Sequence, residues 1–159
     1  MERFSIKKVA APLPSAFLEG ANWADAYEFC YLKKKQNALE AAEVMFAPTP
    51  PLWIRALNAM RNRVVGLFGI KPGQITIDST KSGAFPIVAQ SDETVVYGFD
   101  DWHLNFRIAL QIRDTPTGRA VTLTTLVHRK NWYGYCYIFL ISPFHRLIVK
   151  HLLRNLSSR

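Results

Sequence analysis

Apolar and polar residues alternate without interruption over residues 101–113, near the middle of the chain. The even positions are all apolar: Trp102, Leu104, Phe106, Ile108, Leu110 and Ile112. The odd positions are polar or charged apart from Ala109. A period of two over this length is typical of a β-strand that buries one face and keeps the other face polar. The pattern therefore predicts one long strand whose even-numbered side chains belong to the core.

Five further stretches have strand character. They span residues 22–33, 74–79, 84–91, 93–100 and 119–130. A two-residue turn at Asp100-Asp101 would place Tyr97 opposite Leu104. This register pairs apolar side chains with apolar side chains, so we expect the strands on either side of the turn to form a hairpin.

A second hairpin follows directly. A four-residue turn at residues 115–118 would place Ile112 opposite Val121 on the apolar face. On the polar face the same register places His128 opposite Asn105. A slip of one residue would move every apolar side chain to the other face, so the pattern predicts a well-defined antiparallel sheet.

Two helices are expected between the first strand and the rest of the sheet. Residues 38–46 consist mostly of strong helix formers. A proline-rich break follows, in which Thr49 is a candidate N-cap. Apolar residues then recur every three or four positions to about Phe68, and Gly69 is expected to end this amphipathic helix.

A long apolar helix is expected over residues 131–156, with Asn131 as its N-cap. Pro143 lies inside this range. Its ring clashes with a backbone carbonyl one turn back, so we expect a kink or a break near Leu140.

The order of these elements predicts the fold class. Residues 1–21 are expected to be an extended lead-in, residues 22–156 the folded domain, and residues 157–159 a frayed tail. One apolar sheet face and one long apolar helix must bury each other. We therefore predict a single α+β domain in which a curved antiparallel sheet of about six strands wraps around the C-terminal helix.

This order resembles the helix-grip, START-like (SRPBCC) superfamily, and three segments resemble the family called domain of unknown function 2867 (DUF2867). The segments are residues 51–71, 93–110 and 131–153. The matching positions are Pro51, Trp53, Arg61-Asn62, Phe68-Gly69, Gly98, Asp101, His103-Leu104, Phe106-Arg107, Gly134, Tyr137, Pro143-Phe144-His145 and Ile148. The superfamily resemblance implies a cavity between sheet and long helix for a hydrophobic or amphipathic small molecule. Some family members also carry a nicotinamide-binding domain, which has no counterpart in this sequence, so no cofactor is expected.

Charge and cysteine content narrow the function classes. The formal net charge is +8, which favours anionic partners. The basic residues are scattered in pairs and triplets rather than gathered on one helix, so nucleic-acid binding is not expected and a membrane surface is a secondary alternative. Cys30 and Cys136 have apolar neighbours and no metal-ligand spacing, which predicts reduced, buried thiols. There is no secretory signal pattern, and the apolar run 132–144 is too short to span a bilayer, so a cytoplasmic location is expected.

Eight residues are candidates for ligand contact. Aromatic side chains would form the wall of the site and three polar side chains would anchor the ligand: Trp53, Trp102, Phe106, Tyr133 and Tyr137, with His103, Arg107 and His145. Aromatic residues at helix and strand spacing are also typical of ordinary core, and an alternating polar strand face is also typical of a solvated surface. His145 and Arg146 could instead cap carbonyls freed by the Pro143 kink. No third ligand accompanies His103 and His128, so no metal site is expected.

Three function classes remain open. The preferred interpretation is a protein that binds a lipid, a polyketide-like or an aromatic compound, and it rests largely on fold-level analogy. The alternative is a cyclase, isomerase or hydrolase with His103 or His145 as general acid or base, which requires one of these histidines to face the interior. A third is a peripheral-membrane or protein-binding adaptor that uses Arg146, Lys150 and Arg154.

Overall fold

The computed structural model describes residues 5–31, 36–47, 52–67 and 86–157. Six strands form one antiparallel sheet in the order β1-β2-β6-β5-β4-β3. The strands are β1 (Ile6–Val9), β2 (Trp23–Tyr31), β3 (Ile87–Gln90), β4 (Thr94–Asp100), β5 (Leu104–Thr115) and β6 (Gly118–Arg129). The helices are α1 (Ala38–Phe46), α2 (Leu52–Leu67) and α3 (Trp132–Asn155).

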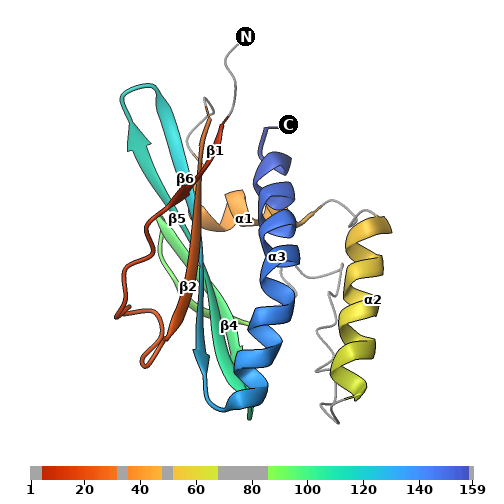
Figure 1. The fold of residues 1–159 in the computed structure, drawn as a ribbon. Helices are drawn as coiled ribbons and strands as arrows, with labels where there is room; N and C mark the ends of the chain where they lie inside the picture. The colour runs from red at the N-terminus through yellow and green to blue at the C-terminus, as the bar shows by residue number, and fades with distance from the viewer. Residues whose placement is uncertain (1–4, 32–35, 48–51, 68–85, 158–159) are drawn as a thin grey trace.

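All three helices lie on one side of the sheet (Figure 1). α3 runs along the sheet, α1 packs between the sheet and the C-terminal half of α3, and α2 lies beyond α3, away from the sheet (Figure 1). The predicted α+β class, with an antiparallel sheet and a long C-terminal helix, is confirmed.

The register of the β5–β6 hairpin is the predicted one. Ile112 pairs with Val121, and Asn105 pairs with His128. Alternation identified the face that is buried, because the even-numbered side chains of β5 point toward the helices and join the core.

The predicted β4–β5 register was wrong by four residues. Asp100 pairs with Asn105 and Tyr97 pairs with Ile108, so the two-residue turn does not form. The connection is longer because the backbone N–H of Asp101 donates to the carbonyl of Leu104. A shift by an even number keeps every side chain on its face, which is why the apolar surface survives the error.

The N-terminal lead-in contains a strand that the sequence pattern did not indicate. β1 pairs with β2 at the edge of the sheet, with Ile6 opposite Phe29. The strand predicted at residues 74–79 lies outside the described residues, as do Thr49 and Gly69. The six strands of the sheet are therefore not the same six that the pattern predicted.

The two N-caps within the described ranges explain where α1 and α3 begin. The Asn37 side chain accepts from Glu40 N, and the Glu40 side chain accepts from Asn37 N, which makes a capping box for α1. Asn131 caps α3 as predicted, with its side chain accepting from Gly134 N. Both helices thus start where a short polar side chain satisfies an otherwise unpaired backbone donor.

α3 continues through Pro143, so the predicted break near Leu140 was wrong. Proline lacks an N–H, so the Phe139 carbonyl loses its usual helical donor. The Ser142 hydroxyl donates to this carbonyl at 3.3 Å. The expected capping by His145 is not what the structure shows, because His145 bonds across to the sheet.

Gly134 allows the start of α3 to approach the β4–β5 turn. A Cβ atom at this position would overlap the backbone carbonyl of His103. Only glycine permits this contact without a shift of the helix. The close packing of α3 on this turn therefore explains why glycine occupies position 134, one of the positions that carry the resemblance to DUF2867.

The two cysteines are exposed, which corrects the expectation of buried thiols. Cys30 lies on the outer face of β2 and Cys136 lies on α3; neither forms a disulfide. An apolar neighbourhood in sequence did not translate into burial, because the side chains of both residues point away from the sheet–helix interior.

Candidate functional site

A polar row crosses the otherwise apolar interior beneath the middle of α3. It consists of Asp25 on β2, Thr125 on β6 and His145 on α3. Asp25 and Thr125 are neighbours because they pair directly in the β2–β6 ladder. His145 Nε2 lies 3.0 Å from Thr125 Oγ1, and the Trp23 ring packs edge-on against the imidazole at 6.0 Å.

Asp25 is the most unusual member of this row. The residue is 4% exposed, and within the described part of the chain neither carboxylate oxygen has a partner at full hydrogen-bond geometry, although the Tyr27 hydroxyl is close enough to interact with the carboxylate. Lys8 Nζ lies 3.8 Å from Oδ1, which is within ion-pair range but too long for a hydrogen bond, and the Lys8 side chain is largely exposed. Buried carboxylates are almost always paired, so an unsatisfied one indicates a role other than stability.

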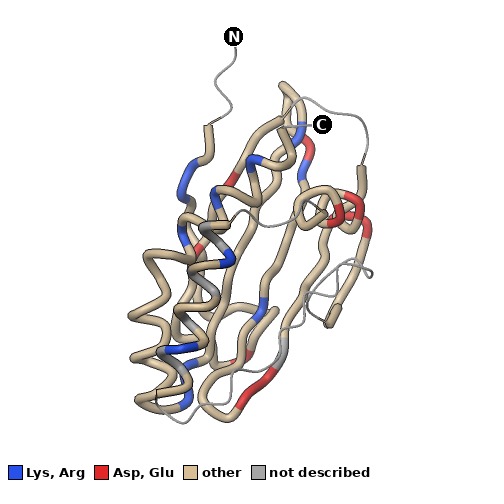
Figure 2. Tube along the Cα trace, turned by 90° about the vertical axis from the view of Figure 1, so that its right-hand side faces the viewer, with Lys and Arg blue, Asp and Glu red and all other residues tan. Residues whose placement is uncertain are grey.

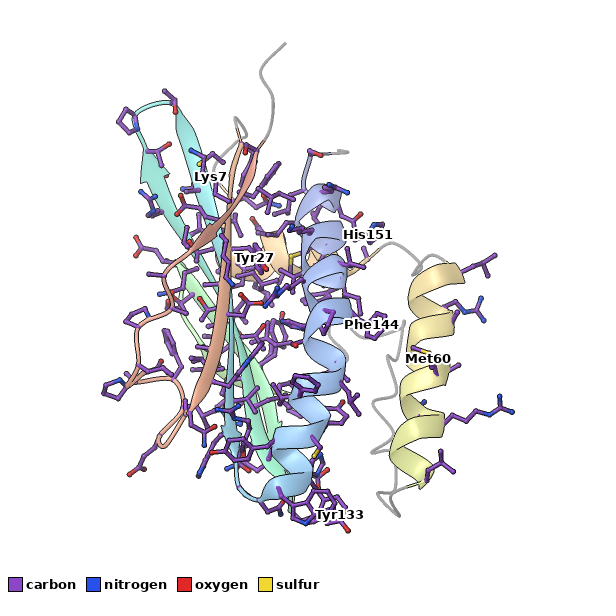
Figure 3. The ribbon with its side chains drawn as sticks, viewed as in Figure 1. Lys7, Tyr27, Met60, Tyr133, Phe144 and His151 are labelled. Carbon is purple, nitrogen blue, oxygen red and sulfur yellow. The ribbon has the colours of Figure 1, made fainter. Side chains whose placement is uncertain are left out.

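The neighbours of Asp25 are held in their neutral forms. Burial lowers the pKa of His145; the Asp25 carboxylate opposes this shift and the charge of Arg146 adds to it. Burial also raises the pKa of Tyr27, and the nearby Asp25 raises it further through its charge and through an interaction with the Tyr27 hydroxyl. Figure 3 shows Tyr27 pointing from β2 toward α3. The row therefore combines a carboxyl group with a neutral imidazole and a hydroxyl.

The polar row separates two apolar clusters. The larger cluster contains Tyr27, Leu110 and the buried face of α1, while the smaller one contains Leu104, Val127 and Ile138. On β5 the inward side chains of Phe106 and Ile108 lie next to the polar row, between the two apolar clusters, and both are only half-buried. The inner face of the central strand is therefore incompletely covered beside the polar row.

A family model described as a protein of unknown function, DUF2867, matches residues 17–152. The chain belongs to this family. The matched range includes all three members of the polar row. No curated protein and no solved structure matches the chain. The family description assigns no activity, so the function has to be argued from the site.

Several candidate residues of this DUF2867 chain gather at one end of α3, away from the polar row. His103 packs edge-on against Tyr137 at 5.6 Å, and Trp102 contacts both His103 and Tyr133. His103 was placed on the polar strand face, but β5 begins at Leu104, so His103 lies in the turn and faces α3. Burial lowers its pKa, opposed by the Asp101 carboxylate.

Two other candidate residues, both on β5, lie on opposite faces of the sheet. Phe106 lies on the inner face beside the polar row, whereas Arg107 lies on the outer face and pairs with Asp100 at 2.8 Å. The Trp53 side chain lies outside the described residues. Among the described residues, no group of three His, Cys, Asp or Glu side chains could hold a metal ion.

The outer sheet face is partly covered by the segment before β2. Gly20, at φ +73°, approaches the His128 ring so closely that a Cβ would lie 3.2 Å from it. The Asn22 side chain bonds to the backbone of Arg129. The His128 ring therefore lies under the segment before β2 rather than in an open site.

Asp25 and Thr125 were missed by the sequence reasoning, although a signal was present. Asp25 has the same parity as Tyr27 and Phe29, and Thr125 has the same parity as Leu123 and Val127. Each is one polar residue on an otherwise apolar strand face. Such a break in alternation marks a buried polar group, but only the β2–β6 pairing shows that the two breaks coincide.

Proposed function

We propose that this protein binds a hydrophobic or amphipathic small molecule between the sheet and α3. We also propose that it belongs with the helix-grip, START-like proteins. The order of strand, two helices, antiparallel strands and long helix supports this placement. The ligand's apolar part would lie along Phe106 and Ile108, and its polar group would meet Asp25, Thr125 and His145.

The observation that carries the proposal is the buried Asp25 carboxylate, for which the described residues supply no partner at full hydrogen-bond geometry. A buried acceptor left unpaired costs about 1–3 kcal/mol, so the folded chain alone does not benefit from it. A ligand that donates to Asp25 would satisfy it. Binding sites commonly combine an apolar lining with a few such polar groups.

The chemistry of the row indicates the kind of polar group. The Asp25 carboxylate oxygens are hydrogen-bond acceptors, while Thr125 and neutral His145 can each donate or accept. The complementary ligand group is a donor, such as a hydroxyl or an amine. Lys8 and Arg146 near the row disfavour a second cationic charge, so a hydroxylated amphipathic compound fits best.

Native mass spectrometry of the protein purified from its own host tests the proposal. We expect a small molecule at up to one per chain that denaturing extraction releases. Asp25→Leu should abolish its retention, whereas Glu28→Gln should not, because Glu28 lies on the same strand but bonds Arg113 on the outer face. Equal retention by both variants, or a bound molecule without any hydroxyl or amine donor, would contradict the proposal.

An enzymatic role is the second candidate, and one observation favours it. His103 faces α3 while His145, on α3, faces the sheet, and neutral His145 can act as a proton acceptor. The same mass spectrometry distinguishes the two roles. A co-purifying compound that changes mass during incubation with wild type, but not with His145→Gln, would favour turnover over binding.

A further inference from the structure

The outer side of α3 is apolar and exposed over most of its length. Its exposed apolar side chains are Trp132, Tyr135, Phe139, Leu140, Phe144 and Leu147. Phe139 is 81% exposed and Trp132 is 60% exposed. Large apolar side chains rarely gather on the water-exposed surface of a protein unless that surface binds another protein or a membrane.

α2 extends this surface rather than covering it. Phe144 and Met60 lie between α3 and α2 (Figure 3), yet both remain more than one-third exposed. Leu52 and Leu67, at the two ends of α2, are also strongly exposed. The two helices together thus form a broad layer that the other described residues leave exposed.

The charges of this layer all have one sign. Ranges 52–67 and 132–155 contain six Lys or Arg and no Asp or Glu: Arg55, Arg61, Arg63, Arg146, Lys150 and Arg154. Figure 2 shows blue and no red along both helices. Arg55, Arg63 and Arg154 are exposed on the two helices, whereas Lys150 lies over the Tyr27 ring at the side of α3 that faces β2. The layer that exposes apolar side chains therefore carries basic side chains and no acidic ones.

Aromatic side chains surround the N-terminal end of the layer. Trp132 stacks on Tyr133 at 4.1 Å, and the half-exposed Trp102 packs against Tyr133 at 5.4 Å. The Arg129 guanidinium lies over the Tyr135 ring. Amphipathic aromatic rings beside basic groups are typical of the headgroup region of a bilayer.

We propose that the outer faces of α2 and α3 dock on the surface of an anionic lipid bilayer. Apolar side chains would enter the interface while the basic side chains meet anionic headgroups. A second copy of the chain would be a poor occupant, because it would bring its own Arg55, Arg63 and Arg154 against basic side chains of the same sign.

α3 is expected to lie in the plane of the bilayer rather than to cross it. By length and composition alone this 24-residue helix is apolar enough to span a membrane. However, its inner side buries Ile138, Val149 and Leu153 against the rest of the chain. Crossing would remove α3 from the sheet and expose to water the apolar sheet face that α3 now covers.

Flotation of the full chain with vesicles tests the docking. Vesicles of phosphatidylcholine alone are compared with vesicles containing 30% phosphatidylglycerol, at low and high salt. We expect binding to the anionic vesicles that high salt weakens. Equal binding to both compositions, no binding to either, or retention that only detergent reverses would overturn the proposal.

Matched variants assign the surface. Phe139→Ser should weaken binding by roughly tenfold, and Arg55→Gln with Arg63→Gln by roughly fivefold per charge. The controls are Val88→Ser, an exposed apolar residue on β3, and Lys7→Gln with Arg113→Gln on other strands. Equal losses in the controls, or a stable dimer that Phe139→Ser dissociates, would overturn the assignment. The surface does not include the polar row, so this proposal and the ligand proposal can fail separately.

Discussion

Replacing Asp25 by leucine is expected to stabilise the free protein. The side chain is buried on the apolar face of β2, and neither carboxylate oxygen has a partner at full hydrogen-bond geometry within the described residues. Leucine has a similar branched shape and needs no partner. A site that evolved for stability alone would not keep this carboxylate, whereas binding sites often reduce stability in exchange for function.

The magnitude follows from two terms. Relief of an unsatisfied buried acceptor contributes about 1–3 kcal/mol. Loss of the Lys8 contact at 3.8 Å removes at most about 1 kcal/mol, because the lysine is solvent-exposed. We therefore expect the free energy of unfolding to rise by roughly 0–3 kcal/mol, which corresponds to an increase in Tm of up to roughly 12 °C for a chain of this size.

Urea unfolding followed by far-UV circular dichroism measures the effect at pH 7, with the m-value as a check on two-state behaviour. Asp25→Asn should gain less than Asp25→Leu, because the amide keeps polar atoms that need partners. Glu28→Gln, on the opposite face of the same strand, should change stability by less than about 1 kcal/mol. If Asp25→Leu lowers the free energy of unfolding by more than 1 kcal/mol, the carboxylate is satisfied in the folded chain and the reasoning is refuted.

Three further predictions concern pH, packing and capping. Burial lowers the pKa of His145 and His103 below 6.5, so in acid the unfolded chain binds more protons than the folded chain. The free energy of unfolding should therefore fall as the pH drops below about 6.5. Urea titrations at several pH values should show a weaker dependence on pH for His145→Gln. Gly134→Ala should destabilise by about 1–3 kcal/mol because its Cβ overlaps the His103 carbonyl, whereas Gly66→Ala on α2, with open space around it, should not lower Tm. Asn37→Ala should cost about 1 kcal/mol through loss of the capping box, measured as a lower urea midpoint; an unchanged midpoint would contradict that role.

Local rules account for the elements that the sequence predicted well. The alternation along β5 identified the buried face, and the turn at residues 115–118 set the β5–β6 register. Strong helix formers and Asn37 set the bounds of α1, and Asn131 set the start of α3. Each of these features depends on residues close together in sequence, whose periodicity and capping chemistry act without distant partners.

The errors arose where a specific hydrogen bond or a strand pairing outweighs the pattern of apolar and polar residues. The Asp100-Asp101 turn was displaced because the Asp101 N–H bonds to Leu104, and an even-numbered shift leaves the apolar pattern unchanged. β1 carries no strong pattern of its own and becomes a strand by pairing with β2. α3 tolerates Pro143 because Ser142 supplies the missing donor.

The sequence by itself determined the α+β class, the apolar sheet face and the long helix that covers it, because side-chain periodicity repeats within single elements. It also indicated His145 as a candidate residue. Only the tertiary structure decided that Asp25, Thr125 and His145 form one buried row, since they lie on three elements that the β2–β6 pairing and the packing of α3 bring together. The same packing decides which side of α3 remains exposed. Apolar side chains lie on more than one side of this helix, so its sequence does not say which side packs against the sheet.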